Sequence, residues 1–304
     1  MLIETTHAAP DAASNTSNGA VPDSAGDNAE NGTAHNAIPD AMQTEAWRLS
    51  SKTARAHIRA GFNSHTSGMA PGYGQGNLMI LPKSWADEFL AFCRANSTPC
   101  PLIGMTENGS SLVPMLGDDV DLKTDLPRYR VWHDGVMTEE RDDISDLWTD
   151  DLVGFVLGCS LSFESALEEA GLRVRHVDEG TIVPMFRTNI QTHAVGRLHG
   201  AMVTSMRPYT PEQAKLAYEI CGRLPGAHGA PVHMGDPAAI GIEDVMRPDE
   251  GEPTDILPGE VPVFWACGVT PQSVAMQAKP PFCITHAPGH MLISDIKTED
   301  LVLL

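Results

Sequence analysis

Residues Val261–Met291, VPVFWACGVTPQSVAMQAKPPFCITHAPGHM, hold the most informative succession of elements in the chain. The apolar run at 261–266 is too short to cross a membrane and rich in strand-forming residues, which predicts a buried strand. Cys267 and the glycine after it end that strand. Thr270 is followed by proline, a pair typical of a helix start, and this predicts a helix that continues to about Ala278.

The second half of the stretch returns to extended structure and then turns. A short strand is predicted at 282–284, and a polar Pro-Gly turn at 285–290 contains His286 and His290. In α/β proteins, sites are commonly built at the carboxyl end of a sheet. This stretch has the order expected there: a strand, a cysteine, a capped helix, a second strand and paired histidines. We therefore expect Cys267 and the two histidines to line one site.

The stretch at 152–167, LVGFVLGCSLSFESAL, repeats this order. A buried strand ends at a cysteine, and a hydroxyl residue follows where a helix begins. We infer two structurally related strand–turn–helix units, with a chance likeness as the alternative because the match is short. The corresponding positions are Cys159 and Cys267, Ser162 and Thr270, Glu164 and Gln272, and His176 and His286, each histidine at the end of a predicted short strand.

Composition narrows the class of protein. The 304 residues are 42% hydrophobic, which suits about two domains with a sizeable core. A net charge of -20 and a pI of 4.8 argue against nucleic acid or an anionic membrane surface as partner. Six cysteines without a CxxC pair, and no secretory segment, predict reduced thiols in a cytoplasmic protein. No apolar run reaches the roughly 18 residues of a membrane span.

The order of segments predicts the domain organisation. Residues 1–43 carry acids and almost no large apolar side chain, so we expect a disordered acidic tail. The catalytic region at 44–304 is expected to comprise a main α/β domain, about 44–115 and 210–304, and a smaller inserted domain at about 116–209. Helices are predicted at 51–61, 82–95 and 211–223.

Several polar residues outside the two units are candidates for substrate binding. Ser67 lies in a glycine-rich turn at 65–77, which is either a ligand-binding loop or an ordinary connection. Arg187 and Arg207 each follow a short apolar run, at 183–189 and 203–208. At a sheet edge they would hold a carboxylate, although an ordinary ion pair is the alternative. Asn189 lies close to the first of them.

No metal or cofactor is expected. Three aspartates at 118–121 lack EF-hand spacing and are interpreted as a solvated acidic loop. His228 and His233 flank a proline and cannot be helical metal ligands, although a loop zinc site is the alternative.

Eight motifs, in this order, closely resemble the "putative hydro-lyase" family, which is the family of the D-glutamate cyclase domain. The resemblance extends over about residues 50–296, and the acidic N-terminal extension departs from the short bacterial relatives. The motifs are TSGMAPGYGQGNLMILP, DLKTDLPRYRVW, GCSLSFESAL, VPMFRTNI, SMRP, HGAPVHMGDP, VFWACGVTPQ and KPPFCITHAPGHMLISDI.

The resemblance implies an α/β fold, with a mixed sheet, flanking helices and a smaller inserted α+β domain. It also implies a carbon–oxygen hydro-lyase that converts D-glutamate to 5-oxo-D-proline and water. Motif position suggests Cys267 and His286 beside the reacting carbon, with His290 and Cys159 near them. Either thiol could instead be packed in the core. Ser67, Thr270, Asn189, Arg187 and Arg207 would bind the substrate, a small amino or carboxylic acid.

Two other functions remain open. Cys159 and Cys267 could be the opposed acid–base thiols of an amino-acid racemase or epimerase, or the protein could be a non-catalytic binder of a small carboxylic acid. The sequence also leaves a homo-oligomer open.

Overall fold

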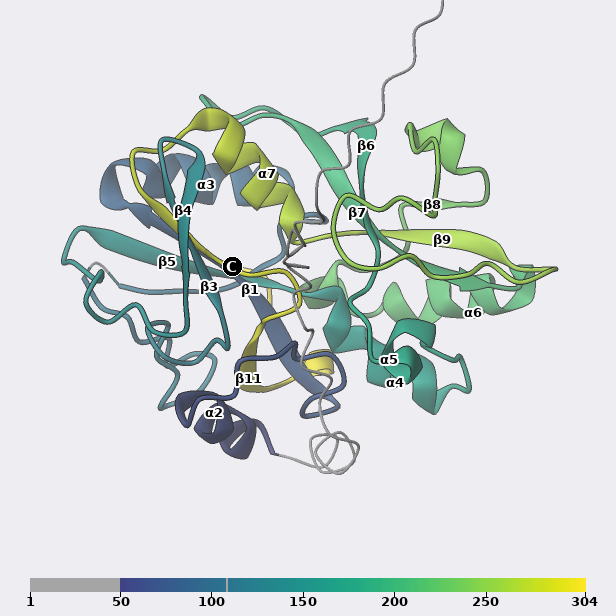
Figure 1. Cartoon of the computed structure of the whole chain (residues 1–304), viewed down its shortest axis with the longest axis horizontal. Helices are drawn as coiled ribbons and strands as arrows, with labels where there is room; N and C mark the ends of the chain where they lie inside the picture. The colour runs from purple at the N-terminus through teal and green to yellow at the C-terminus, as the bar shows by residue number, and fades with distance from the viewer. Residues whose placement is uncertain (1–49, 108) are drawn as a thin grey trace, which may run out of the picture. The chain divides into compact units, whose positions relative to one another are not determined.

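The computed structural model describes residues 50–107 and 109–304, which form two β-sheets with helices packed against them (Figure 1). The predicted fold class is confirmed, and every strand pair in these residues is antiparallel. None of their helices is long and apolar enough to span a membrane. The predicted tail at 1–43 lies outside the described residues.

Strand β1 (Tyr73–Pro82) is the centre of the larger, seven-stranded sheet. It pairs with β5 (Leu152–Gly158) along one side. On its other side β11 (Leu292–Lys297) pairs with its first half and β10 (Cys283–His286) with its second half. Residues 287–291 therefore leave the sheet as a turn beside the middle of β1. The remaining strands are β2 (Leu102–Met105), β3 (Tyr129–His133) and β4 (Val136–Arg141), and the order is β2-β5-β1-β10-β3-β4.

The smaller sheet has four strands in the order β6-β7-β9-β8. Its long central strands are β7 (Ala201–Tyr209) and β9 (Val261–Ala266), which pair with Thr204 opposite Ala266. The strand predicted at 261–266 is confirmed. The apolar runs at 183–189 and 203–208 also lie in strands, β6 and β7 respectively. The outer strands are β6 (Met185–Gln191) and β8 (His233–Met234).

The two sheets do not divide at the expected domain boundaries. Strands β3, β4 and β5 fall within 116–209, yet they belong to the larger sheet. Strands β8 and β9 fall within 210–304, yet they belong to the smaller sheet. Local sequence does not show this division, because the partner of a strand is chosen by tertiary packing and not by its own residues.

The longer helices form where the sequence predicts them, and several short helical segments accompany them. The helix α3 begins one residue after Pro82, whose fixed φ suits a helix start. The helices are α2 (Ser51–Arg59), α3 (Lys83–Ala95), α4 (Glu164–Glu169), α5 (Arg175–Glu179), α6 (Pro211–Cys221) and α7 (Val269–Ala278), and the 3₁₀ segments are η1 (Ser160–Phe163), η2 (Pro225–Ala227), η3 (Pro237–Ile240) and η4 (Thr298–Asp300).

Two local predictions are wrong. The strand predicted at 174–176 is instead the start of α5, and only Val174 of the three residues is of a strand-forming type. The side chain of Arg175, the first residue of α5, is held by both carboxylate oxygens of Glu260, at 3.1 and 2.7 Å. The glycine-rich segment at 65–77 is a turn only as far as Gly72, since its last five residues already pair as part of β1.

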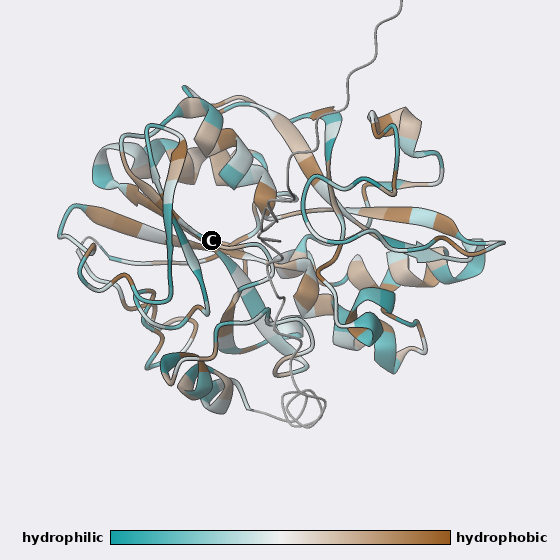
Figure 2. Cartoon of the chain, viewed as in Figure 1, coloured by the Kyte–Doolittle hydropathy of each residue, from teal (hydrophilic) through white to brown (hydrophobic). Residues whose placement is uncertain are grey.

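Aromatic side chains join α3 to the larger sheet. Trp85, Phe89 and Phe92 are buried, as their helical spacing predicts. The ring of Phe89 meets that of Phe155 on β5 edge to face, with 4.9 Å between centroids. Figure 2 shows hydrophobic colour along β5 and β9, whereas α4 and α5 are largely hydrophilic.

An ion-pair cluster holds α2 against β11. Arg55 is fully buried and contacts Asp295 at 2.9 Å and Asp119 at 2.5 Å. Burial alone would raise the pKa of Asp295, but hydrogen bonds from Arg55 and Ser51 lower it below its ordinary value. Because the pKa is lowered on folding, this carboxylate stabilises the fold above about pH 4, and the contribution disappears as the pH falls through the folded-state pKa.

We expect Asp295→Asn to lower the free energy of unfolding by about 1–3 kcal/mol at pH 7, the range for hydrogen bonds to charged groups. At pH 2.5 the difference in unfolding urea concentration between wild type and variant should be smaller, because the carboxylate is then closer to protonation. Urea titrations of both proteins at the two pH values measure this, and an equal loss at both would contradict the ionic origin of the effect.

Candidate active site

One cavity is lined by residues from both sheets, at the turn that separates β10 from β11. It encloses about 430 Å³ of space free of atoms, its open mouth included. None of the described residues that line it is Lys, Arg, Asp or Glu. Its polar groups come from neutral side chains and from backbone. These side chains are His65, Ser67, Asn77, Cys159, Ser160, Cys267 and His286, among apolar neighbours that include Met185 and Met291.

The two cysteine turns are built in the same way, which confirms the inferred relation between the two units. The N–H of Cys159 donates to the carbonyl of Gln75, and the N–H of Cys267 donates to that of Val203, both at 3.0 Å. Three residues later, the hydroxyl of Ser162 or Thr270 bonds to the N–H and the C=O of that same partner. Each turn is thus fastened to the neighbouring strand by three hydrogen bonds.

This arrangement differs from the helix start predicted at Thr270. The N-terminus of α7 is at Gly268 and has no side-chain cap. The Thr270 hydroxyl is fully buried and engaged with Val203, 2.9 Å from its nitrogen and 3.2 Å from its oxygen. The Thr270 hydroxyl is therefore not a cap for α7. The N–H groups of Gly268 and Val269 remain beside Cys267.

Burial is the largest influence on both thiols, and it raises the pKa of Cys159 to about 12 and that of Cys267 to about 11. Backbone N–H groups act in the opposite direction. The N–H of Leu161 lowers the pKa of Cys159, and those of Val269 and Gly268 lower the pKa of Cys267, without outweighing burial. Both side chains are therefore neutral thiols near pH 7, beside N–H groups that can bind an anion.

The correspondence extends to the histidines. Gln272 of α7 lies 2.7 Å from Nδ1 of His286, and the equivalent Glu164 lies 2.9 Å from Nε2 of His176. Only His286 lines the cavity, since His176 lies in α5 and not on a strand. Both units therefore place a histidine against the side chain of the corresponding helical residue, a glutamine in one and a glutamate in the other, but only one of these histidines faces the cavity.

His286 is held as a neutral ring. Its Nδ1 accepts the N–H of Leu78 on β1 at 3.1 Å, opposite the break between β10 and β11. Burial, above all, lowers the pKa of His286 to about 3. A neutral imidazole that accepts at Nδ1 carries its proton on Nε2. His286 is thus arranged to donate a hydrogen bond rather than to take a proton.

His65 is a residue of this cavity that the sequence does not single out. Its neighbour Thr66 is fully buried, accepts the N–H of Met291 at 3.1 Å and donates its own N–H to the carbonyl of Gly289 at 2.8 Å. These bonds fasten residues 65–67 to the turn at 287–291. The flanking His65 and Ser67 thereby come to line the cavity.

The ring of His65 has a free, buried nitrogen. Its Nδ1 is buried and has no hydrogen-bond partner in the described residues. The hydroxyl oxygen of Ser67 is likewise buried without a partner. Burial lowers the pKa of His65 below its ordinary value, which the charge of Glu252 opposes. The ring is therefore neutral near pH 7 and can accept a proton.

Of the residues predicted from sequence, the structure brings together Cys159, Cys267, His286 and Ser67. His290 does not line the cavity, and its Nδ1 lies 2.8 Å from the carbonyl of Pro288 within the adjoining turn. Asn77 is a further lining residue, whose side-chain amide donates to Gly158 at 2.8 Å and to Leu157 at 3.3 Å.

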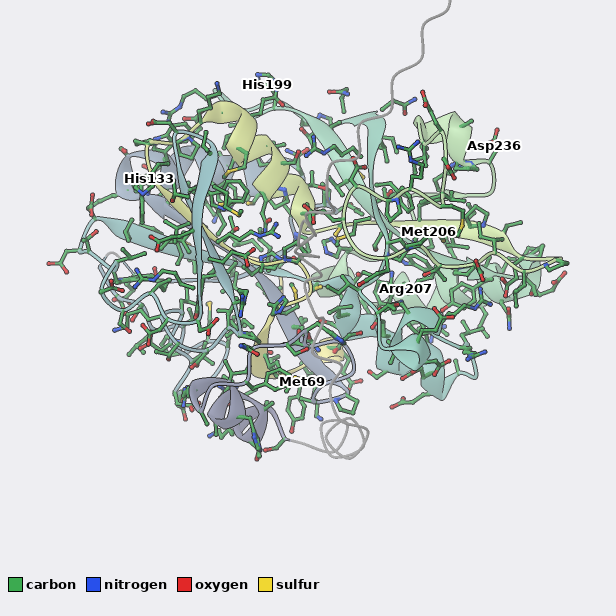
Figure 3. All side chains as sticks on the ribbon, in the orientation of Figure 1. Met69, His133, His199, Met206, Arg207 and Asp236 are labelled. Carbon is green, nitrogen blue, oxygen red and sulfur yellow. The ribbon has the colours of Figure 1, made fainter. Side chains whose placement is uncertain are left out.

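Arg207, labelled in Figure 3, does not line the cavity but contacts Ser160, which does. It is buried, donates to Ser160 at 3.1 Å and to Ser205 at 3.2 Å, and forms an ion pair with Glu164. Arg207 belongs to β7, whereas Ser160 follows β5, so this guanidinium ties the Cys159 turn to the smaller sheet. It positions the turn and does not reach the cavity itself.

Arg187 and Asn189 lie elsewhere. Both are exposed side chains of β6. Arg187 lines a separate surface hollow with Arg247 and Asp249. Arg187 and Arg207 therefore do not bind one carboxylate together. They follow similar apolar runs, but Arg187 on β6 is exposed at the surface and Arg207 on β7 is buried.

No group of three or more His, Cys, Asp or Glu suited to hold a metal occurs in residues 50–107 and 109–304. Nδ1 of His228 lies 2.8 Å from the Thr98 carbonyl, and Nε2 of His233 lies 2.7 Å from that of Asp236. Asp119, from the acidic loop, is engaged by arginines of α2.

Comparison with known proteins identifies the family. A "Putative hydro-lyase" from Verminephrobacter eiseniae is 55% identical over 263 residues, which cover 86% of this chain and 96% of the relative. The chain belongs to the "putative hydro-lyase" family. Members from Xanthobacter autotrophicus and Jannaschia sp. are each 56% identical, over 79% and 81% of this chain and 87% and 92% of their own lengths. The protein is accordingly a lyase of the hydro-lyase class.

A family profile described as D-glutamate cyclase matches residues 153–295 of this hydro-lyase. That range contains both cysteine turns and His286, while His65 precedes it. Among solved structures, a nitrogen repressor-like protein from Methanococcus jannaschii covers 84% of this chain, and 98% of its own, at 9% identity and a TM-score of 0.36, too low to bear on the fold.

Proposed function

We propose that this hydro-lyase converts D-glutamate to 5-oxo-D-proline and water. The α-amine attacks the γ-carboxyl carbon, a lactam forms, and one γ-oxygen leaves as water. The observation that carries the proposal is the pair of like turns at Cys159 and Cys267 in one cavity, each with backbone N–H groups beside its thiol. Two such turns suit a substrate with two carboxylates at its ends.

The lining of the cavity supports this substrate class. A substrate with two carboxylates would find no guanidinium or ammonium among the described lining residues. It would depend instead on backbone N–H groups and on neutral donors such as the Ser67 hydroxyl, which has no partner in the described residues. Such donors are strongest where water is excluded, and one well-aimed donor of this kind is worth about 10²–10³ in rate.

The proton balance requires only one base. The substrate ammonium loses two protons, and the departing oxygen gains both, so the overall reaction neither releases nor consumes a proton. His65, whose Nδ1 is free and buried, would take each proton from the amine and pass it to the leaving oxygen. His286 would donate its Nε2 proton in a hydrogen bond to the γ-oxygen as negative charge develops there.

This assignment predicts the pH dependence of turnover. The active form of His65 is the neutral one, and burial lowers its pKa, so the rate should fall only as the pH drops through this lowered pKa, on the acid side of the ordinary histidine value. His286, with a pKa of about 3, should not titrate in this range. Rates measured from pH 4.5 to 9 test this. A rate that rises steadily as the pH falls would contradict a neutral His65 base.

A racemase is the second candidate, because both thiols line the same cavity. A racemase of this kind needs one thiolate, whereas burial raises the pKa of both cysteines to about 11 and 12. The proposed cyclase leaves the α-carbon proton in place. Incubation in deuterium oxide separates the two, since only racemisation places deuterium on the α-carbon.

The direct test of the proposal is incubation of purified, chelator-treated protein with D-glutamate and with L-glutamate, followed by chiral chromatography. We expect 5-oxo-D-proline from the D form and no product from the L form. No lactam from either enantiomer would exclude the proposed reaction. We also propose that the protein acts in the cytoplasm, which suits its six free cysteines.

A further inference from the structure

A second cavity lies behind the Cys159 turn. Leu161 lines both cavities and separates them. The second cavity encloses about 300 Å³ of space free of atoms, and its wall includes the loop at 68–73, on which Met69 is labelled in Figure 3. Oxygen atoms are abundant around it. They belong to the carboxylates of Glu164 and Glu168, the hydroxyls of Ser162 and Ser165, and the loop backbone.

One carboxylate oxygen at this cavity is buried without a partner. Glu164 is only 4% exposed, and its Oε1 is the atom that meets both Arg207 and His176. Its Oε2 is buried and has no hydrogen-bond partner in the described residues. Because Oε1 faces the arginine and Glu164 lines the cavity, Oε2 is the oxygen directed into it. A buried carboxylate oxygen left unpaired costs free energy, and such an atom calls for an occupant.

The charge around the cavity is negative. Two carboxylates line it, and no Lys, Arg or His is among its described lining residues. Burial first, and then the charges of Glu164 and Asp178, raise the pKa of Glu168 to about 7. Burial opposes the charged form of Glu164, but His176 and Arg207 lower its pKa below the ordinary value. The carboxylate without a positive partner among the described lining residues is therefore that of Glu168.

We propose that this cavity binds one small monovalent cation, of the kind of K⁺, Na⁺ or NH₄⁺, through oxygen atoms of Glu164 and Glu168. Because Arg207 already offsets the charge of Glu164, the two carboxylates leave room for one further positive charge. The cation would lie behind the Cys159 turn and offset negative charge close to the active site.

The test uses the full chain without substrate, so that it does not depend on the proposed reaction. Protein dialysed into choline chloride is titrated with KCl, NaCl or NH₄Cl at constant ionic strength, and the melting temperature is recorded. We expect a saturable rise of about 2–4 °C with at least one of the three cations, because a ligand that binds only the folded state stabilises it. Equal melting temperatures in all four salts would overturn the proposal and leave water as the occupant.

Glu168→Gln supplies the site-specific control. Glu168 is half-buried and makes no hydrogen bond to another described side chain, so the variant should fold, and it should lose the cation-dependent rise. Glu169→Gln alters the neighbouring exposed carboxylate and should keep the rise. An undiminished rise in Glu168→Gln, or an equal loss in both variants, would place the cation effect elsewhere on the protein and contradict this site.

Discussion

Replacing His65 by glutamine is expected to lower turnover of D-glutamate by about 10²–10⁴-fold, the usual contribution of a general base. His65 lines the cavity, and its buried Nδ1 has no partner in the described residues. Glutamine retains a polar group of similar reach but cannot take a proton. We therefore expect kcat to fall far more than KM changes, because the lost interaction belongs to the proton transfer.

The matched control is His199→Gln, which changes an exposed histidine outside the cavity, labelled in Figure 3. Its turnover and melting temperature should equal those of wild type. The melting temperature of His65→Gln should also remain close to that of wild type, because the ring is half-buried and Nδ1 has no bond to lose. Undiminished turnover in His65→Gln would remove this residue from the mechanism.

The second large effect concerns stability. Arg207→Met should lower the free energy of unfolding by about 3–5 kcal/mol, the typical loss when one partner of a buried ion pair is removed. Arg207 is 2% exposed, and its removal leaves the buried carboxylate of Glu164 without its arginine. The hydrogen bond to Ser160 is lost as well, so the Cys159 turn should also become less well ordered.

A surface pair provides the comparison for this variant. Arg173 pairs with Asp178, but its side chain is 69% exposed, so Arg173→Met should cost less than about 1 kcal/mol. The double variant Arg207→Met with Glu164→Gln should recover part of the loss, since no bare charge is then buried. Chemical denaturation of the three variants measures these differences. An Arg207→Met protein as stable as wild type would contradict the structural role of the pair.

The sequence predicted the elements better than their partners. Periodicity located α3, and a short apolar run located each of β5 and β9, because a buried face leaves a local pattern. The local pattern does not indicate which sheet a strand joins. The expected domain boundaries therefore differ from the way the strands are shared between the two sheets. Arg207 shows the same limit, since its place behind the cavity depends on Glu164, which is 43 residues away.

The candidate site was partly predictable for a similar reason. Cys159 and Cys267 stand at equivalent positions of two like segments, and that likeness pointed to both. His65 stands in no repeated pattern. It is brought to the cavity by two hydrogen bonds between Thr66 and the turn at 287–291, one from the Thr66 N–H and one to its hydroxyl. A histidine beside a buried threonine, just before a glycine-rich loop, was the only local signal available.

The most direct test of the proposed reaction follows the oxygen that leaves. D-glutamate carrying ¹⁸O at both γ-carboxylate oxygens is incubated with the protein, and the lactam is examined by mass spectrometry. We expect 5-oxo-D-proline that retains one of the two labelled oxygens. It should form much more slowly with His65→Gln, and no lactam should form from labelled L-glutamate. Labelled D-glutamate that is recovered unchanged, or converted to L-glutamate without lactam, would contradict the proposed reaction.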